Sequence, residues 1–279
     1  MTSVRTYQRP SSLEEAWSLL NENGKSAKLV GGGIDVALHT PTEVTTLIDV
    51  SQLGSRSIEL RDGALILGAS ATLTELLESS AVADYLDGVI ATMLQQVASP
   101  LLRNVATLAG TLASTHPWSD VITLFLALDA RVTQFAGEVK TKALGDLLEN
   151  RGTMDRAIIT EVALPAFPQG TVASFESFVR SRIDVAMLNC ACRLTWDGNC
   201  RDVRVVFGGT PSIGHRLISV EDALTGKALT SETIESAVAL ASESIDARDD
   251  LRASADYRRI LAGNGLRVCC QRMAQKVGE

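Results

Sequence analysis

Residues 103–113 read Arg103-Asn104-Val105-Ala106-Thr107-Leu108-Ala109-Gly110-Thr111-Leu112-Ala113, and residues 29–35 read Leu29-Val30-Gly31-Gly32-Gly33-Ile34-Asp35. Loops this poor in large side chains let backbone N–H groups approach a ligand closely. Converging N–H donors suit phosphate groups, and a pyrophosphate best of all. One such loop is a weak signal, but two of them in one chain predict a dinucleotide that is held from both sides.

Composition places the chain among ordinary soluble globular proteins. It has 279 residues, of which 46% are hydrophobic and 21% charged, enough for a sizeable core in two domains. A net charge of -7 argues against a nucleic-acid partner, because no basic patch would replace phosphate counterions. No apolar run is long enough to span a bilayer, and the first residues lack the apolar core of a signal peptide. We therefore expect a cytoplasmic protein without membrane insertion.

The five cysteines do not form a recognisable metal motif. Cys190 and Cys192 are two residues apart in an apolar run, so on a strand they would share a face. The remaining cysteines and the three histidines are scattered, and no iron–sulfur spacing is present. We expect no metal site and interpret the cysteines as reduced thiols packed like small hydrophobic side chains.

Local patterns predict helices and strands along the first part of the chain. Residues 10–15 and 72–75 both have the form of a capping box at a helix start. Asn23-Gly24 would end the first helix, and Asp62-Gly63 is a hairpin turn sequence. Helices are also expected at 85–97 and 121–128, and strands at 28–30, 45–50, 58–60, 64–67, 131–135, 138–140 and 157–164.

The stretch 165–170 is the best candidate for a domain boundary, because it holds two prolines and a glycine. It divides the chain into residues 1–168 and 169–279. The second part reads as strands followed by helices, with strands at 175–179, 186–196 and 201–207 and helices at 230–247 and 255–274. The sequence thus predicts an α+β fold whose second domain is a small α+β layer.

The first glycine loop allows two further readings. Gly31, Gly33 and Val36 nearly spell the G-x-G-x-x-G of a Rossmann turn. That fold needs a crossover helix in a βαβ unit, and Thr40-Pro41 would end such a helix early, so we expect no such unit here. A plain glycine turn without a ligand is the other reading.

The second loop carries a family resemblance. Residues 103–113, followed by Pro117-Trp118-Ser119-Asp120, resemble the signature R-N-x-x-T-I-G-G-N-L-A…P-x-x-D of the FAD-binding medium subunit of molybdenum hydroxylases, the xanthine dehydrogenase and carbon monoxide dehydrogenase family. The first loop resembles that family's A-G-G-T-D-L. Matching segments run through nearly the whole chain in order: 10–16, 67–69, 126–130, 175–184, 207–209 and 254–259.

The resemblance implies a fold and a site. The N-terminal domain would have the vanillyl-alcohol-oxidase-type (PCMH-like) FAD-binding fold, with FAD between two small α/β subdomains, and the C-terminal domain would be the family's flavoprotein C-terminal domain. The two loops would wrap the pyrophosphate, Asp120 would contact a ribose hydroxyl and Ile159 would lie by the flavin. The implied cofactor-binding residues are Val30, Gly31, Gly32, Gly33, Ile34, Asp35, Val36, Thr107, Ala109, Gly110, Thr111, Asp120 and Ile159.

The resemblance also implies a function. The chain would be a flavin-dependent oxidoreductase subunit that holds FAD non-covalently, with no histidine such as His116 attached to it. Electrons would come from a small 2Fe-2S subunit, supplied by a large molybdenum-cofactor subunit, and would leave to NAD⁺, oxygen or another acceptor. The flavin does the redox chemistry, so no catalytic side chain is assigned.

Four departures from the family pattern leave alternatives open. Ile34 stands where the family has threonine, Ala109 replaces the first glycine of a pair, and Thr111 replaces Asn, Asp or Ser. Glu176 stands where a lysine is common, and would either face the flavin or form a salt bridge at the surface. A scaffold subunit that has lost FAD and a stand-alone flavin oxidoreductase are the competing hypotheses.

Overall fold

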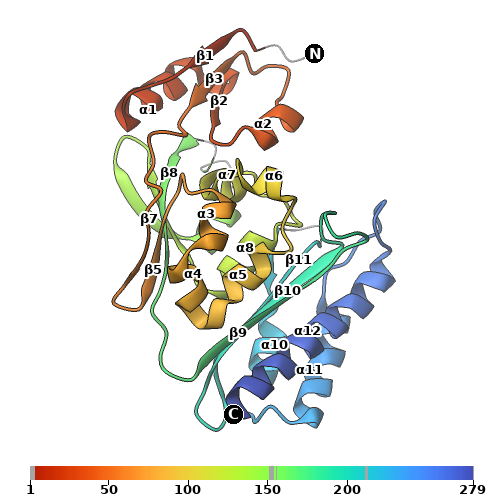
Figure 1. Cartoon of the computed structure of the whole chain (residues 1–279). Coiled ribbons are helices and arrows are strands. Elements are labelled where there is room, and N and C mark those ends of the chain that lie inside the picture. Colours follow the sequence, from red (N-terminus) through yellow and green to blue (C-terminus); the bar gives the residue numbers. More distant parts are fainter. Residues whose placement is uncertain (1–3, 151–153, 155, 211–212, 279) are drawn as a thin grey trace. The chain divides into compact units, whose positions relative to one another are not determined.

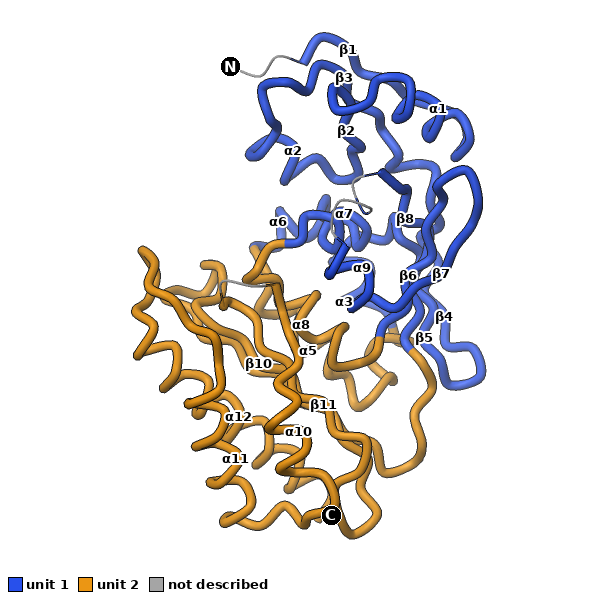
Figure 2. The backbone as a smooth tube through the Cα atoms, turned by 180° about the vertical axis from the view of Figure 1, so that it is seen from behind, with its two compact units in different colours: residues 1–79, 99–115, 130–164 blue, residues 80–98, 116–129, 165–279 orange. Residues whose placement is uncertain are grey.

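The computed structural model describes residues 4–150, 154, 156–210 and 213–278. The chain forms two compact units (Figure 2). Unit 1 comprises residues 1–79, 99–115 and 130–164, and unit 2 comprises residues 80–98, 116–129 and 165–279. Both glycine loops lie in unit 1. In the part of the chain that the structure describes, no helix has the length and hydropathy to cross a membrane.

A small parallel sheet begins unit 1 (Figure 1). Its strands are β1 (Thr6–Gln8), β2 (Ala27–Val30) and β3 (Thr46–Asp49), in the order β1-β3-β2. Helix α1 (Leu13–Asn23) joins β1 to β2, and α2 (Ile34–His39) joins β2 to β3. The expected absence of a βαβ unit is therefore wrong, because β2, α2 and β3 form one. The helix is short, as Thr40-Pro41 indicated, but the whole connection, residues 31–45, is long enough to return the chain to a parallel strand.

The ends of α1 follow the sequence prediction. Ser12 is the N-cap and accepts a hydrogen bond from the Glu15 amide, while the Glu15 carboxylate accepts one from the Ser11 amide. Gly24 follows the last turn at φ +53°, a conformation that glycine adopts without a Cβ clash. The buried face of the helix, Ala16 and Leu20, packs in a core that also contains Ile48, Phe135 and Ile158.

A five-stranded antiparallel sheet forms the second layer of unit 1. Its order is β4-β5-β8-β6-β7, made of β4 (Ile58–Arg61), β5 (Ala64–Gly68), β8 (Ile158–Leu164), β6 (Arg131–Phe135) and β7 (Val139–Ala143). Asp62 and Gly63 turn the first hairpin with φ values of +51° and +79°, as a type I′ turn requires. The helices are α3 (Leu73–Glu78), α6 (Pro100–Arg103), α7 (Leu108–Ala113) and α9 (Leu144–Glu149).

Unit 2 is built on an antiparallel sheet of order β12-β11-β10-β9. The strands are β9 (Thr171–Phe178), β10 (Leu188–Trp196), β11 (Cys200–Gly208) and β12 (His215–Arg216). Figure 1 shows α11 (Ser231–Ser244) beside α12 (Ala255–Gly278), which packs on β9 and β10. Helix α8 (Asp120–Ala127) contacts β10 and β11, and α10 (Ile218–Leu224) follows β12. The predicted order of strands followed by helices is confirmed.

The helix expected at 85–97 is interrupted. Helix α4 (Ser80–Asp84) is followed by the short 3₁₀ segment η2 (Tyr85–Gly88) and then by α5 (Val89–Leu94). Leu86 and Asp87 have left-handed φ values of +46° and +53°, so the chain cannot continue one helix through them. The expectation of a single helix is wrong because apolar spacing reports which side chains are buried and not the backbone conformation between them.

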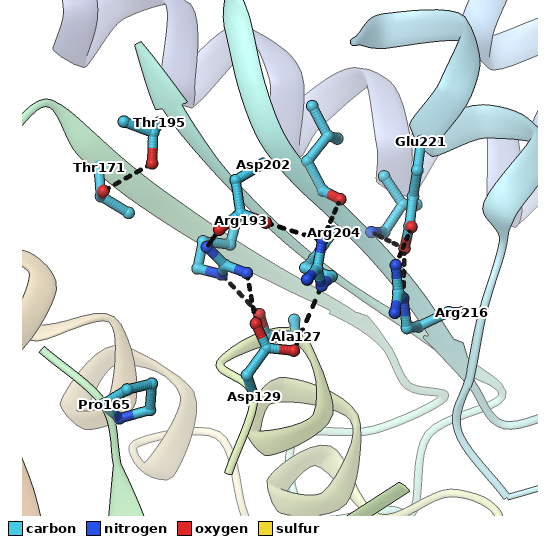
Figure 3. A network of polar contacts seen from close by, with 12 residues as sticks. Ala127, Asp129, Pro165, Thr171, Arg193, Thr195, Asp202, Arg204, Arg216 and Glu221 are labelled. Atoms are coloured by element: carbon cyan, nitrogen blue, oxygen red, sulfur yellow. Dashed lines mark hydrogen bonds and ion pairs between the residues drawn. The ribbon is translucent and has the colours of Figure 1, made fainter. Parts of the chain in front are cut away.

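A buried arginine connects β10 to the end of α8 (Figure 3). The guanidinium of Arg193, with no exposed surface, donates to the Ala127 carbonyl at 2.9 Å and to carboxylates of Asp129 and Asp202, each at 2.6 Å. Its carbon also lies 4.4 Å from the centroid of the Phe167 ring. The charge is thus paired by two carboxylates that reach the surface, an arrangement that makes its burial tolerable.

Replacing this arginine tests how much the network stabilises unit 2. Arg193→Ala should lower the free energy of unfolding by about 3 kcal/mol, since it leaves a cavity and an unpaired carbonyl. The exposed pair between Arg201 and Asp197, at 3.0 Å, provides the control, and Arg201→Ala should cost less than about 1 kcal/mol. Urea unfolding followed by circular dichroism measures both, and equal losses for the two variants would contradict the assignment.

Candidate functional site

The two glycine loops meet inside unit 1. A Cβ atom built on Gly32 would lie 1.7 Å from the carbonyl oxygen of Val105, and one built on Gly31 would lie 2.7 Å from the Thr107 Oγ1 atom. Real side chains do not approach that closely, so only glycine allows this contact at either position. Segments that are some seventy residues apart in the sequence therefore form one surface, as the pyrophosphate hypothesis requires.

The first loop leaves its amide groups open. Gly33 has φ +78° and precedes α2, so the chain turns sharply after Val30. Among the described residues, no carbonyl or side chain accepts a hydrogen bond from the amides of Gly31, Gly32 or Gly33. Unsatisfied N–H groups in a tight glycine turn are the donors from which anion-binding concavities are made. The open amides of this loop are therefore available to an anionic group such as a diphosphate.

The second loop uses most of its amides within the protein. The amide of Leu108 donates to the Ala71 carbonyl and that of Ala109 to the Ala69 carbonyl, both at 2.9 Å. The Gly110 amide donates to the Thr107 Oγ1 atom at 3.1 Å, because Thr107 is the N-cap of α7. This loop therefore offers a phosphate fewer hydrogen-bond donors than its glycine content suggests. It centres on Thr107, whose hydroxyl accepts this bond and donates to no described residue.

Two of the departures from the family pattern find a structural explanation. Ala109 lies in the first turn of α7, outside the positions with positive φ, so alanine is not strained there. Alanine in fact favours a helix over glycine by about 1 kcal/mol. The Thr111 hydroxyl donates to the Thr107 carbonyl at 2.9 Å and thus helps to close the same turn. Ile34 is the first residue of α2, where its amide is available whatever its side chain.

The remaining residues of the first loop have other surroundings. Val30 is buried at the end of β2. The Asp35 carboxylate lies 3.4 Å from the Lys28 Nζ atom and 3.0 Å from the His39 Nδ1 atom, so its charge is shared with two side chains of its own segment. Val36 is half-buried in α2. The roles of these three side chains toward a ligand stay predictions.

Ile159 is a buried residue of β8 and is tied to the second loop through the backbone. The neighbouring Thr160 carbonyl accepts from the Ala69 amide at 3.2 Å, and the Ala69 carbonyl accepts from Ala109. This places the strand that carries Ile159 beside the start of α7, to which it also packs. Sequence reasoning did not identify the carbonyl groups of Ala69, Ala71 and Val105 as parts of the site, because backbone acceptors leave no mark in residue type.

Asp120 belongs to unit 2, where it begins α8 behind the N-cap Ser119. Its Oδ1 atom accepts hydrogen bonds from the Asn189 side-chain amide at 2.6 Å and from the Ser177 hydroxyl at 3.2 Å. Burial raises the pKa of Asp120 from 3.8 to about 6, although both hydrogen bonds lower it. The Thr123 hydroxyl in turn donates to the Asn189 Oδ1 atom at 2.8 Å, which fixes the orientation of the amide. Ser177 and Asn189 are partners that the sequence did not reveal.

Three other residues singled out in the sequence also lie in unit 2. The Glu176 carboxylate forms a 2.7 Å ion pair with Arg272, so the salt-bridge reading is the one the structure shows. The His116 ring stacks on Trp118 with centroids 4.7 Å apart, and the Arg252 guanidinium lies 4.7 Å from the centroid of the Trp118 ring. Trp118 therefore contacts two side chains of its own unit.

Known proteins share this architecture over the whole chain. The profile of the family described as FAD binding domain in molybdopterin dehydrogenase matches residues 2–167, and that of the CO dehydrogenase flavoprotein C-terminal domain matches residues 173–273. The carbon monoxide dehydrogenase medium chain of Hydrogenophaga pseudoflava is 29% identical over 266 residues, 92% of each chain. The xanthine dehydrogenase FAD-binding subunit of Escherichia coli O157:H7 is 28% identical over 271 residues, also 92% of each chain.

The solved structures agree. Carbon monoxide dehydrogenase from Hydrogenophaga pseudoflava, in a form that lacks the Mo-pyranopterin moiety of the molybdenum cofactor, matches with a TM-score of 0.89 at 25% identity, over 99% of both chains. The fold and the loop contact thus define a flavoprotein of the α+β, PCMH-like class. The chain belongs to the family of FAD-binding domains in molybdopterin dehydrogenases. It is the FAD-binding, electron-transferring subunit of a multi-subunit, flavin-dependent oxidoreductase of the molybdenum hydroxylase type.

Substitution of the loop contact tests the site directly. Gly32→Ala places a methyl group against the Val105 carbonyl and should weaken FAD binding more than tenfold, about 1.4 kcal/mol, because the loops must separate. Ala109→Gly, the residue that the family pattern has, should leave the affinity within about twofold while it lowers helix stability by about 1 kcal/mol. Calorimetric titration with FAD measures both. Equal affinities for the wild type and Gly32→Ala would refute the loop contact.

The titration of Asp120 gives a prediction with a defined sign. Because the folded state raises the pKa of this carboxyl from 3.8 to about 6, the native protein holds the proton more tightly than the unfolded chain. The stabilising contribution of Asp120 is therefore complete below about pH 4 and is lost as the pH rises to about 6. Asp120→Asn should remove this decline, so the variant gains stability relative to the wild type between these pH values.

A second carboxyl provides the control of opposite sign. The hydrogen bond and charge of Arg180 lower the pKa of the half-buried Asp184. Asp184→Asn should therefore lose stability relative to the wild type as the pH rises toward about 3.8, and the difference between the two proteins should then stay constant between about pH 4 and pH 6. Chemical denaturation at a series of pH values measures both variants. The assignment of Asp120 fails if its variant follows the wild-type profile in parallel.

Proposed function

We propose that the diphosphate of FAD binds to the open amides of Gly31, Gly32 and Gly33 and to the hydroxyl of Thr107. The observation that carries this proposal is the direct contact between the two loops, which brings these donors to one surface of unit 1. An acidic chain with a net charge of -7 can bind an anionic group in this way, because backbone dipoles supply the positive potential without a lysine cluster. Lys28 is already engaged by Asp35.

We propose that the other residues predicted from the family pattern also contribute to the FAD site. Ile34, Asp35 and Val36 would contribute backbone groups, and Ala109, Gly110 and Thr111 would shape the surface around the Thr107 hydroxyl. Within the described residues the second oxygen of Asp120, Oδ2, accepts no hydrogen bond, so it has capacity for a ribose hydroxyl. Ile159 and Val30, which are both buried, would support the site from behind with apolar side chains. These roles rest on the family pattern and on local geometry within each unit.

Bound FAD supplies the electron-transfer chemistry, receiving electrons from one partner and giving them to an external acceptor. The protein holds the cofactor non-covalently and orients it, and no side chain of this chain need act as an acid or base. The two relatives named above are the medium chain of carbon monoxide dehydrogenase and the FAD-binding subunit of xanthine dehydrogenase. We propose by analogy that a large subunit with molybdenum cofactor and a small 2Fe-2S subunit are separate chains that assemble with this one.

The electron acceptor, the domain boundaries and the cellular location stay predictions. NAD⁺ is one proposed acceptor. We propose functional domains at residues 1–168 and 169–279, supported by the gap between the two family matches at 168–172. The compact units divide the chain differently, since residues 80–98 and 116–129 cluster with the C-terminal part. The cytoplasmic location expected from the sequence is likewise a prediction.

The scaffold hypothesis is not favoured. It rested on Ile34, Ala109 and Thr111, yet Ala109 and Thr111 are compatible with the first turn of α7, and the first-loop amides remain open. A stand-alone oxidoreductase is not favoured either, because the matching relatives are subunits by name and match over nearly their full length.

Reconstitution with FAD tests the proposed function, and substitution of Thr107 tests the proposed contact with the diphosphate. The purified chain should bind one FAD, and FAD at about a hundred times its Kd should raise the free energy of unfolding by about 2.7 kcal/mol. Thr107→Val should weaken FAD binding about tenfold, since it removes the one side-chain hydroxyl offered to the diphosphate, while Thr107→Ser retains it.

Loss of the helix cap needs its own control. Thr107→Val also removes the N-cap of α7, at a cost of about 1 kcal/mol. Ser12→Ala removes the N-cap of α1 in the same unit at a similar cost, but should leave the FAD affinity unchanged. If the two variants bind FAD equally well, Thr107 acts only as a cap. If the wild type takes up no flavin, the proposed function itself is wrong.

A further inference from the structure

Three buried thiols converge in unit 2, whereas the two glycine loops belong to unit 1. Cys190 and Cys192 lie on the same face of β10, with their Sγ atoms 3.7 Å apart. Cys269 comes from α12, which packs on that face. The three Sγ atoms all lie within 4.8 Å of one another, and none of the residues is more than 1% exposed. Residues that are about eighty positions apart in the sequence thus place three sulfur atoms at one point.

The fold brings the helix unusually close to the strand at this point. Gly265 lies one turn before Cys269 on α12, and a Cβ atom built on it would lie 3.1 Å from the Cys190 Cβ atom. Glycine is unfavourable in the interior of a helix, so its presence here is explained by the close approach. A larger residue at 265 would move α12 away from β10, and the Cys269 thiol with it.

The spacing of the sulfur atoms matches metal coordination. With metal–sulfur bonds of about 2.3 Å, two sulfur ligands of one ion lie about 3.8 Å apart in tetrahedral and about 4.0 Å apart in trigonal geometry. The distance of 3.7 Å between the Cys190 and Cys192 sulfur atoms is slightly below the trigonal value, so these two atoms must move a little apart to bind a three-coordinate ion. The other two pairs fall within the 4.8 Å limit, so only small side-chain movements are needed.

We propose that Cys190, Cys192 and Cys269 form a binding site for a soft monovalent metal ion, Cu(I), coordinated by three sulfur atoms. Thiolate ligands select Cu(I) and Zn(II) among the common ions. Closed structural zinc sites are four-coordinate, however, and no fourth histidine, cysteine or carboxylate among the described residues joins this group. The three-sulfur set therefore favours the ion that is satisfied with three ligands.

Copper retention by the full-length chain tests this proposal. The reduced protein is refolded without oxygen in the presence of Cu(I), then desalted against a copper(I) chelator. We expect one copper per chain, thiolate-to-copper charge-transfer absorption in the ultraviolet, and three sulfur neighbours by X-ray absorption spectroscopy. Cys269→Ala and Cys192→Ser should each reduce the retained copper at least tenfold.

A matched control separates the site from cysteine content. Cys200 is equally buried in unit 2 but is not a member of the cluster, so Cys200→Ala should retain one copper. Circular dichroism verifies that each variant is folded, and the sulfur count on the wild type does not depend on any variant. The proposal is overturned if the wild type retains no copper after refolding, if Cys269→Ala retains as much as the wild type, or if Zn(II) binds with four ligands in preference to Cu(I).

Discussion

The contact between Gly32 and the Val105 carbonyl is the constraint on which the site of this protein depends. It joins a turn after a parallel strand to a turn before a short helix, in a place where a single methyl group would not fit. Because the neighbouring strands and α7 hold both turns, the donors are positioned before any ligand arrives. Such preorganisation reduces the cost of ordering a site upon binding.

The two turns contribute unequally to the site. The amides that follow Thr107 donate hydrogen bonds to the Ala69 and Ala71 carbonyls and to the Thr107 hydroxyl. The second loop is therefore held in place and has few donors left for a ligand. The amides of Gly31 to Gly33 have no such partners among the described residues, and they provide the donors. This asymmetry explains why replacement of a family glycine by Ala109 is compatible with the fold, whereas the glycines at 31 and 32 are required by close contact.

Features that depend on a few adjacent residues could be predicted from the sequence, whereas contacts between distant segments could not. The caps at Ser12 and Thr72 and the Asp62-Gly63 turn were predicted because each depends on a few adjacent residues. The left-handed pair at Leu86 and Asp87 was missed because its residue types do not signal positive φ. A βαβ unit was missed because strands and helix are short, so their periodicity is weak.

The same distinction between local features and long-range contacts applies to the candidate site. The glycines and Thr107 could be named from the family pattern, but their mutual distance, the carbonyl partners of α7 and the environment of Asp120 depend on long-range packing. The cysteine cluster could not be predicted from the sequence either. The spacing of Cys190 and Cys192 indicates that they share a face, but nothing in the sequence indicates that Cys269 packs on that face. Sequence spacing determines which side chains share an element, and tertiary packing determines which elements meet.

Hydrogen exchange of individual amides, with and without FAD, shows whether the first loop supplies the donors to the diphosphate. The amides of Gly31, Gly32 and Gly33 should exchange readily in the free protein and become strongly protected when FAD binds, while those of Leu108 and Ala109 should be protected in both states. Binding of FAD without any new protection at Gly31 to Gly33 would contradict this role of the first loop.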